Sequence, residues 1–154
     1  MDINKLYFVS AGFLPLLDNL SADKKGKWGK MNGQQMIEHL SGFFAISNGK
    51  IKFPLITPIE HLPKFREFLF SDKDFKENTK APILPEEPFL VRCASMGESV
   101  TVLQKEVKDF VKQFSTDDVL TREHPVFGEL NFEEWVLLHH KHVTHHLRQF
   151  ELLL

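Results

Sequence analysis

The chain has 154 residues, of which 42% are hydrophobic and 26% are charged, a composition typical of a globular protein. Its net charge of -2 argues against nucleic acids and anionic lipids as partners, because both are bound by clustered positive charge. The single cysteine, Cys93, cannot form an internal disulfide, and no apolar run approaches the ~20 residues of a membrane span. The first 20 residues lack a signal-peptide cleavage site. We therefore expect one cytoplasmic domain over residues 1–154, without a membrane partner.

Two helices are predicted in the first third of the chain. Residues 4–20 place apolar side chains at helical spacing around an internal proline. After a lysine-rich connector, Asn32 and Gln35 form a capping-box pattern that starts a second helix over residues 32–47. His39 lies within the apolar face of this second helix, where a lone histidine is usually a core residue.

The middle of the chain is predicted to be less regular. Residues 50–58 are apolar and contain two prolines, which favours extended backbone. Residues 58–70 form a short third helix, and residues 71–88 are a polar run followed by a proline-rich one. A connection of this length is often a functional lid, and whether residues 50–89 form one is left open. Residues 89–93 are read as a short strand or an extended stretch.

A further long helix is predicted for residues 97–114, where apolar side chains recur at intervals of three and four. Residues 115–130 are read as a connector that ends in an apolar turn over residues 124–128.

The last stretch, residues 131–154, contains five of the eight histidines and is predicted to be one long helix. Asn131 and Glu134 form a second capping-box pattern, and no Gly or Pro follows them. His142 and His146 continue the apolar stripe at positions where leucine would be expected. Because residues four apart share one face of a helix, both imidazoles can reach a single ion. A His-x3-His pair is a common way for a helix to bind a divalent metal.

Together these elements predict an all-α protein, an up-down four-helix bundle with an extra short helix and a long irregular middle segment. Sites in bundles are built from side chains on facing helices, so His39, His142 and His146 are predicted to converge on a divalent metal. His139 faces the same way and His145 lies on a flank, and whether either one joins the site is left open.

The last helix also resembles a known family. Residues 142–149, HVTHHLRQ, are similar to the His-x3-His-Arg-Gly-Gln motif of the DinB-like superfamily, which also has a histidine near the middle of its second helix. The sequence departs from that motif at Leu147 and Arg148. Similarity to a less characterised branch comes from short stretches that include residues 28–31 (WGKM), 36–40 (MIEHL) and 124–128 (HPVFG), together with Glu134-Trp135.

This resemblance implies a four-helix bundle with zinc or nickel held by His39, His142 and His146, with open coordination positions. It also implies a homodimer and, as in some relatives, transfer of a small thiol to an electrophile or hydrolysis.

Three neutral imidazoles with an open position are the donor set of a catalytic metal. Such an ion lowers the pKa of bound water to about 7, or holds a thiolate as a nucleophile. The leading hypothesis is therefore a metal-dependent thiol transferase or hydrolase that acts on a small molecule. The alternatives are a non-catalytic metal-binding or sensor module, and a structural bundle with incidental histidines. No catalytic residue is assigned. Glu38 is read as a surface charge and Glu134 as a helix cap. Arg148 and Gln149 follow the ligands and could support them or contact a substrate, but surface or packing roles are favoured for both.

Overall fold

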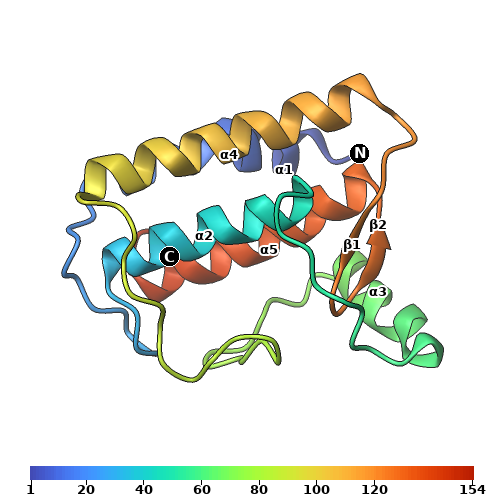
Figure 1. Ribbon diagram of the computed structural model, residues 1–154, viewed down its shortest axis with the longest axis horizontal. Coiled ribbons are helices and arrows are strands. Elements are labelled where there is room, and N and C mark those ends of the chain that lie inside the picture. The colour runs from blue at the N-terminus through green and yellow to red at the C-terminus, as the bar shows by residue number, and fades with distance from the viewer.

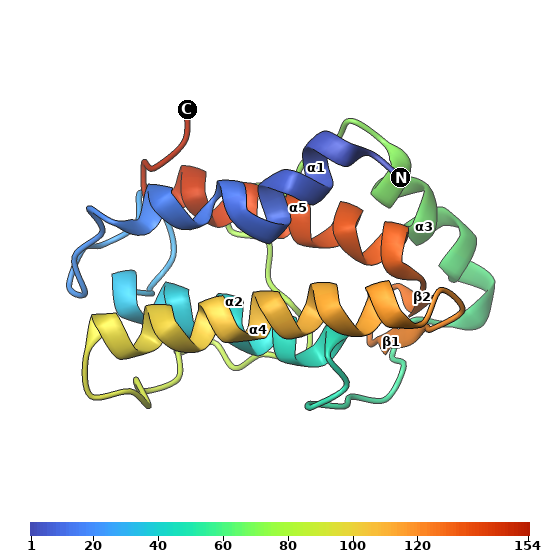
Figure 2. The same cartoon turned by 90° about the horizontal axis from the view of Figure 1, so that it is seen from above.

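Helices α2 (Gly33–Ser47) and α5 (Phe132–Gln149) lie side by side at the centre of the molecule (Figure 1). The structure is a computed structural model that describes residues 1–154. Helix α4 (Met96–Thr116) packs along α2, and the N-terminal segment that begins with α1 (Ile3–Tyr7) packs along α5 (Figure 2). Helix α3 (Leu62–Phe70) lies at one end, next to a small hairpin. No helix is both long and apolar enough to cross a bilayer.

The two central helices begin as the sequence predicts. The Asn32 side chain accepts a hydrogen bond from the Gln35 N–H, and the Gln35 side chain accepts one from the Asn32 N–H. Asn131 and Glu134 form the same reciprocal pair at the start of α5. Each capping box satisfies backbone N–H groups that have no partner within the helix.

Helix α5 ends at Gln149, five residues before the predicted end at residue 154. Glu151 adopts a left-handed conformation with φ 60°, and the Leu152 N–H donates to the Leu147 carbonyl at 2.8 Å. This closure satisfies a carbonyl at the helix end in the way that a C-terminal glycine usually does. Because a glutamate occupies the left-handed position, the sequence carries no ordinary stop signal.

The predicted N-terminal helix over residues 4–20 is helical but not regular. A π-helical turn over Phe8–Gly12 follows α1, and a 3-10 turn over Leu14–Leu17 follows that. The Phe13 N–H donates to the Phe8 carbonyl at 3.1 Å, five residues back, and Pro15 within the 3-10 turn has no N–H to continue an α-helix. The first element is therefore a chain of short helical turns.

The all-α four-helix-bundle prediction is wrong. The structure has five α-helices and a two-stranded antiparallel sheet of β1 (Arg122–His124) and β2 (Gly128–Leu130), so the fold is mixed α/β. The strands form where a connector was predicted, because Gly128 takes φ 77° and the His124 Nδ1 accepts from the N–H groups of Val126 and Phe127. Both features close the tight turn between the strands.

The core between these elements is rich in aromatic rings. Phe13 and Phe44 stack with their centroids 6.5 Å apart, and Phe44 meets Phe110 of α4 edge-to-face at 5.7 Å. Trp135 of α5 is fully buried and donates from its indole N–H to the Arg122 carbonyl, which fastens the hairpin to α5. Phe44 also stacks on the ring of His139 of α5, with centroids 3.8 Å apart, so a ring contact joins the two helices that carry the three histidines.

Candidate metal centre

Three histidines from the two central helices meet at their Nε2 atoms. The Nε2 of His39, on α2, lies 2.9 Å from that of His142, on α5, and the Nε2 of His146 lies 3.1 Å from that of His142. His142 and His146 are one helical turn apart, so their rings project from the same face of α5 toward His39. This is the trio that the sequence predicts, and the structure brings it together.

The three rings are neutral near pH 7. His142 and His146 are buried and His39 is half-buried. Burial lowers the pKa of His39 to about 4. Burial first, and then the neighbouring histidines, hold the pKa values of His142 and His146 well below their usual range. Each ring therefore keeps a nitrogen lone pair free of a competing proton, which is the form that binds a metal.

Gln149 fixes which nitrogen of His146 is protonated. The Gln149 Nε2 donates to the Trp28 carbonyl at 2.8 Å, and a carbonyl can only accept. The Gln149 Oε1 must therefore face the His146 Nδ1, 2.7 Å away, and accept a hydrogen bond from it. The proton then sits on Nδ1, and the lone pair of Nε2 points into the cluster. Hydrogen bonds of this kind orient the histidine ligands of metals in proteins.

Two glycines leave room for this support. A Cβ at Gly26 would lie 2.9 Å from the Gln149 Cγ, and one at Gly29 would lie 2.8 Å from the Gln149 Nε2. Gly29 also has φ 76°, which disfavours other residues. Between them, the Lys27 N–H donates to the Gln149 carbonyl at 2.8 Å. The 26–29 segment thus encloses the end of α5 directly behind His146.

The arrangement of hydrogen-bond donors fits a cation better than it fits the histidines alone. With its proton on Nδ1, His146 can only accept at Nε2, so His142 would have to donate there from its own Nε2. The His142 Nε2 could then no longer accept from His39, and the His142 Nδ1 is buried without a partner. One proton cannot satisfy both nitrogen contacts well. Tetrahedral ligands about 2.0–2.1 Å from zinc lie roughly 3.3 Å apart, close to the observed separations.

The remaining histidines lie outside the cluster. His139 contacts the Ser47 Oγ through Nε2 at 2.9 Å and stacks on Phe44, so it belongs to the core. The His145 ring lies beside that of His146, with centroids 5.1 Å apart, but is not among the three converging histidines. His124 holds the hairpin turn, and His140 meets the edge of Phe8.

Glu38 is not the surface charge that the sequence predicts. Its carboxylate is buried next to His39 and accepts from the N–H groups of Arg92 and Cys93, at 2.8 and 2.9 Å, and from the Ser99 hydroxyl at 3.0 Å. Although burial raises the pKa of Glu38, the hydrogen bonds from Cys93 and Arg92 outweigh it and the pKa is lowered. The carboxylate therefore has a structural role, in fastening the irregular 89–95 segment to α2. Glu134 is the predicted cap and also pairs with Arg66.

The irregular segment between α3 and α4 is anchored at both ends. At its start, the Lys141 ammonium of α5 donates to the carbonyls of Ser71 and Lys73, at 2.7 and 2.6 Å. At its far end, Gln34 and Glu38 of α2 bind residues 92–93. The segment follows the side of the molecule that α2 and α5 share (Figure 1).

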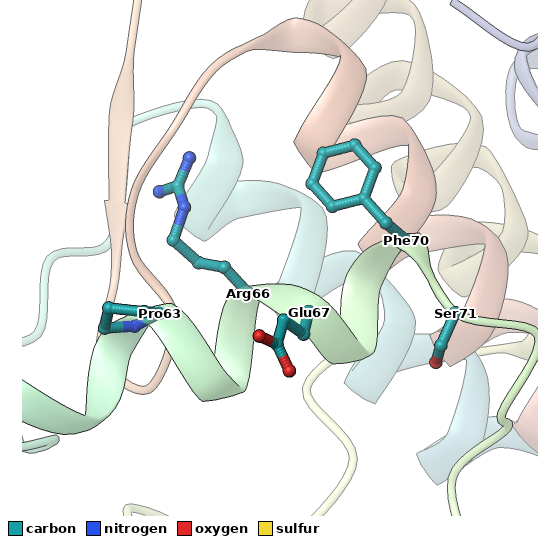
Figure 3. Close-up of a pocket in the computed structure, with 5 residues that line it drawn as sticks. All are labelled: Pro63, Arg66, Glu67, Phe70 and Ser71. Carbon is teal, nitrogen blue, oxygen red and sulfur yellow. The ribbon is translucent and has the colours of Figure 1, made fainter.

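Two surface cavities have a size suited to small molecules. One, of about 540 Å³, lies on α3, where Arg66 and Phe70 project from the helix toward the hairpin and α5 (Figure 3). None of the three converging histidines lines it. The other, of about 530 Å³, borders Trp28, His145 and Arg148, and so adjoins the residues that support His146.

Comparison with known proteins finds one family. Residues 84–152 match the family described as a protein of unknown function, DUF1569. The matched region contains α4, the hairpin and α5, and therefore His142 and His146 but not His39. No curated protein and no solved structure gives a significant match.

The DinB-like resemblance is therefore wrong, because DUF1569 is a distinct family and nothing in the comparison supports DinB-like membership. Histidines four residues apart share one face of any helix, so a similar spacing of two histidines and a glutamine does not by itself indicate membership of that superfamily. The homodimer and thiol transfer that the resemblance implied keep the status of predictions.

Proposed function

We propose that the protein is a metal-dependent enzyme that acts on a small molecule, with one divalent transition metal held by His39, His142 and His146. The observation that supports this most directly is the convergence of three Nε2 atoms within a few ångströms of one another, from two helices. Three neutral nitrogen ligands favour zinc or nickel over magnesium or calcium, which prefer oxygen.

Hydrolysis is the reaction that this set of ligands supports without further assumptions. Three protein ligands leave a coordination position open, and a bound metal would supply an activated water there at neutral pH. The chain's own residues hold the ligands: Gln149 keeps the His146 lone pair directed into the cluster, and His39 completes the donor set from the facing helix α2. Thiol transfer is the second reaction to test at the same centre.

Elemental analysis tests the metal. Protein purified without a histidine tag or chelator is expected to carry about one equivalent of zinc or nickel, and His39→Ala and His142→Ala are each expected to lose it. His140→Ala is the matched control, because this ring lies on α5 outside the cluster. A parent chain that takes up neither Zn²⁺ nor Ni²⁺ when these are added back would contradict the proposal.

Activity assays separate an enzyme from the alternative, a non-catalytic metal-binding or sensor module. The metal-loaded protein is expected to hydrolyse ester or amide substrates, or to transfer a thiol, at a rate that falls to background in His142→Ala. One equivalent of metal without any such turnover would favour the non-catalytic module.

A further inference from the structure

We infer that Phe43 is a positioning residue of the histidine centre, whose aromatic ring holds His142 in the orientation that binds the metal. The metal-binding part of this inference rests on the proposed function, whereas the contact between the two rings does not. His142 takes part in both short nitrogen contacts of the cluster, at 2.9 and 3.1 Å, so the orientation of its ring affects both.

No hydrogen bond from outside the cluster orients the His142 ring. Its Nδ1 is buried and has no partner, whereas the Nδ1 of His146 is held by the Gln149 amide at 2.7 Å. Metal-binding histidines in proteins usually have a hydrogen bond at the second ring nitrogen, which sets the orientation of the ring. A contact of another kind must therefore hold the plane of the His142 ring.

The ring of Phe43 makes that contact. Its centroid lies 4.0 Å from the centroid of His142, with an angle of 31° between the two planes. The rings of His39 and His146 meet His142 more steeply, at 62° and 87°. Phe43 thus packs across the face of the His142 ring. Because protein interiors are close-packed, rotation of the imidazole would drive its edge into the phenyl ring.

Phe43 is in turn held from several sides. It follows His39 by four residues, so helix α2 supplies one ligand and the surface against which a second ligand rests. Its ring meets Trp135 and His139 of α5 edge-to-face, with centroids 6.2 and 5.3 Å apart. It also meets His124 of the hairpin at 5.5 Å. The hairpin and α5 therefore support the centre through Phe43.

Replacement of the ring by an aliphatic side chain tests this role. Phe43→Leu is expected to weaken Zn²⁺ binding about tenfold and to change the visible spectrum of the Co²⁺-loaded protein, because His142 no longer meets the ion at a fixed angle. Phe8→Leu is the matched control: Phe8 is also half-buried, packs against the core and contacts Phe13 and His140 but none of the three ligands. It should bind Zn²⁺ as the parent chain does.

Phe43→Tyr tests whether the aromatic ring itself is needed. Because this variant keeps the ring, it is expected to retain the Zn²⁺ affinity and the Co²⁺ spectrum of the parent chain. Zn²⁺ affinity that is as weak in Phe43→Tyr as in Phe43→Leu, equal affinity in Phe43→Leu and the parent chain, or an equal loss in Phe43→Leu and Phe8→Leu would overturn the inference.

Nuclear magnetic resonance of the metal-free protein separates this inference from the proposed function. The ring current of Phe43 should place the imidazole proton resonances of His142, identified by their loss in His142→Ala, upfield of their positions in Phe43→Leu. That shift in a chain that binds no metal would show that Phe43 orients His142 although the proposed function fails. The absence of the shift, or one equivalent of metal bound with an affinity that Phe43→Leu does not change, would overturn the inference and leave the metal centre standing.

Discussion

The Gln149 side chain bridges two residues that lie far apart in the sequence. Its amide joins His146, three residues before it, to the Trp28 carbonyl, 121 residues away. Gln149→Ala should leave the fold intact and lower metal affinity about 10–100-fold, because the ring of His146 loses its fixed orientation. Competition with a chromogenic chelator measures this. Gln104→Ala, at an exposed position on α4, should have no effect. Equal affinity in the two variants would show that Gln149 only packs against the 26–29 segment.

Gly29 allows a second test of the support that the 26–29 segment gives to Gln149. Gly29→Ala places a Cβ 2.8 Å from the Gln149 Nε2 at a position with φ 76°, so we expect it to destabilise the protein by about 1–3 kcal/mol and to weaken metal binding. Gly42→Ala is the control: a Cβ there meets nothing within 4 Å and lies inside α2, so it should stabilise by about 0.5–1 kcal/mol. Urea unfolding of both variants measures the change in unfolding free energy, which should be negative for Gly29→Ala and positive for Gly42→Ala. An unchanged unfolding free energy in Gly29→Ala would contradict the steric argument.

The site residues were only partly predictable from the sequence. His142 and His146 could be found because they interrupt an apolar stripe at helical spacing, and His39 because it lies on the apolar face of a neighbouring helix. Gln149 could not be assigned, since its partner Trp28 lies in a connector whose path no periodicity defines. Glu38 was misread because its partners are backbone N–H groups of an irregular segment, which leave no pattern in the sequence.

The Glu38 carboxylate joins helix α2 to the irregular segment before α4, and this attachment can be tested. Glu38→Gln replaces one oxygen that accepts a backbone hydrogen bond, and we expect a loss of about 1–3 kcal/mol of unfolding free energy, because one N–H is left without a good acceptor. Hydrogen exchange at the Arg92 and Cys93 amides should accelerate. Glu60→Gln, at an exposed residue of the short 3-10 turn before α3, should change neither quantity. Unchanged exchange at those two amides would show that other contacts hold the segment.

The sequence predicts where the two central helices begin better than where they end. Both capping boxes were identified because a cap and its partner lie three residues apart. The end of α5 was missed because Glu151 takes the left-handed conformation usually left to glycine. The hairpin was missed because each strand has only three residues, too few to show alternation, and because its register depends on a His124 side chain that bonds its own turn.

For the molecule as a whole, burial of neutral histidines predicts sensitivity to acid. The pKa of His124 falls to about 3 and that of His39 to about 4, from an ordinary value of 6.5, because both rings are removed from water. Below pH 6.5 the unfolded chain therefore binds protons that the folded chain does not. The contribution of these histidines to the unfolding free energy is therefore fully present above pH 6.5. It should fall as the pH is lowered to about 4.5, by roughly 1.4 kcal/mol per pH unit for each such histidine.

Urea unfolding of chelator-treated protein between pH 7.5 and 4.5 measures this slope. His124→Asn retains a side-chain oxygen for the N–H groups of the turn and removes one titrating ring, so its slope should be smaller by up to about 1.4 kcal/mol per pH unit. Stability that does not change over this range would contradict the prediction.

The contact between His39 and His142 joins two residues that are 103 positions apart. An ion held between them would act as a reversible cross-link that closes a loop of most of the chain, much as a disulfide does. Because the ion would bind only when the two central helices are together, its binding free energy would stabilise the folded state. The melting temperature should therefore rise with the concentration of free metal. The availability of metal in the surroundings would then set how much folded protein is present, in addition to whether the centre is active.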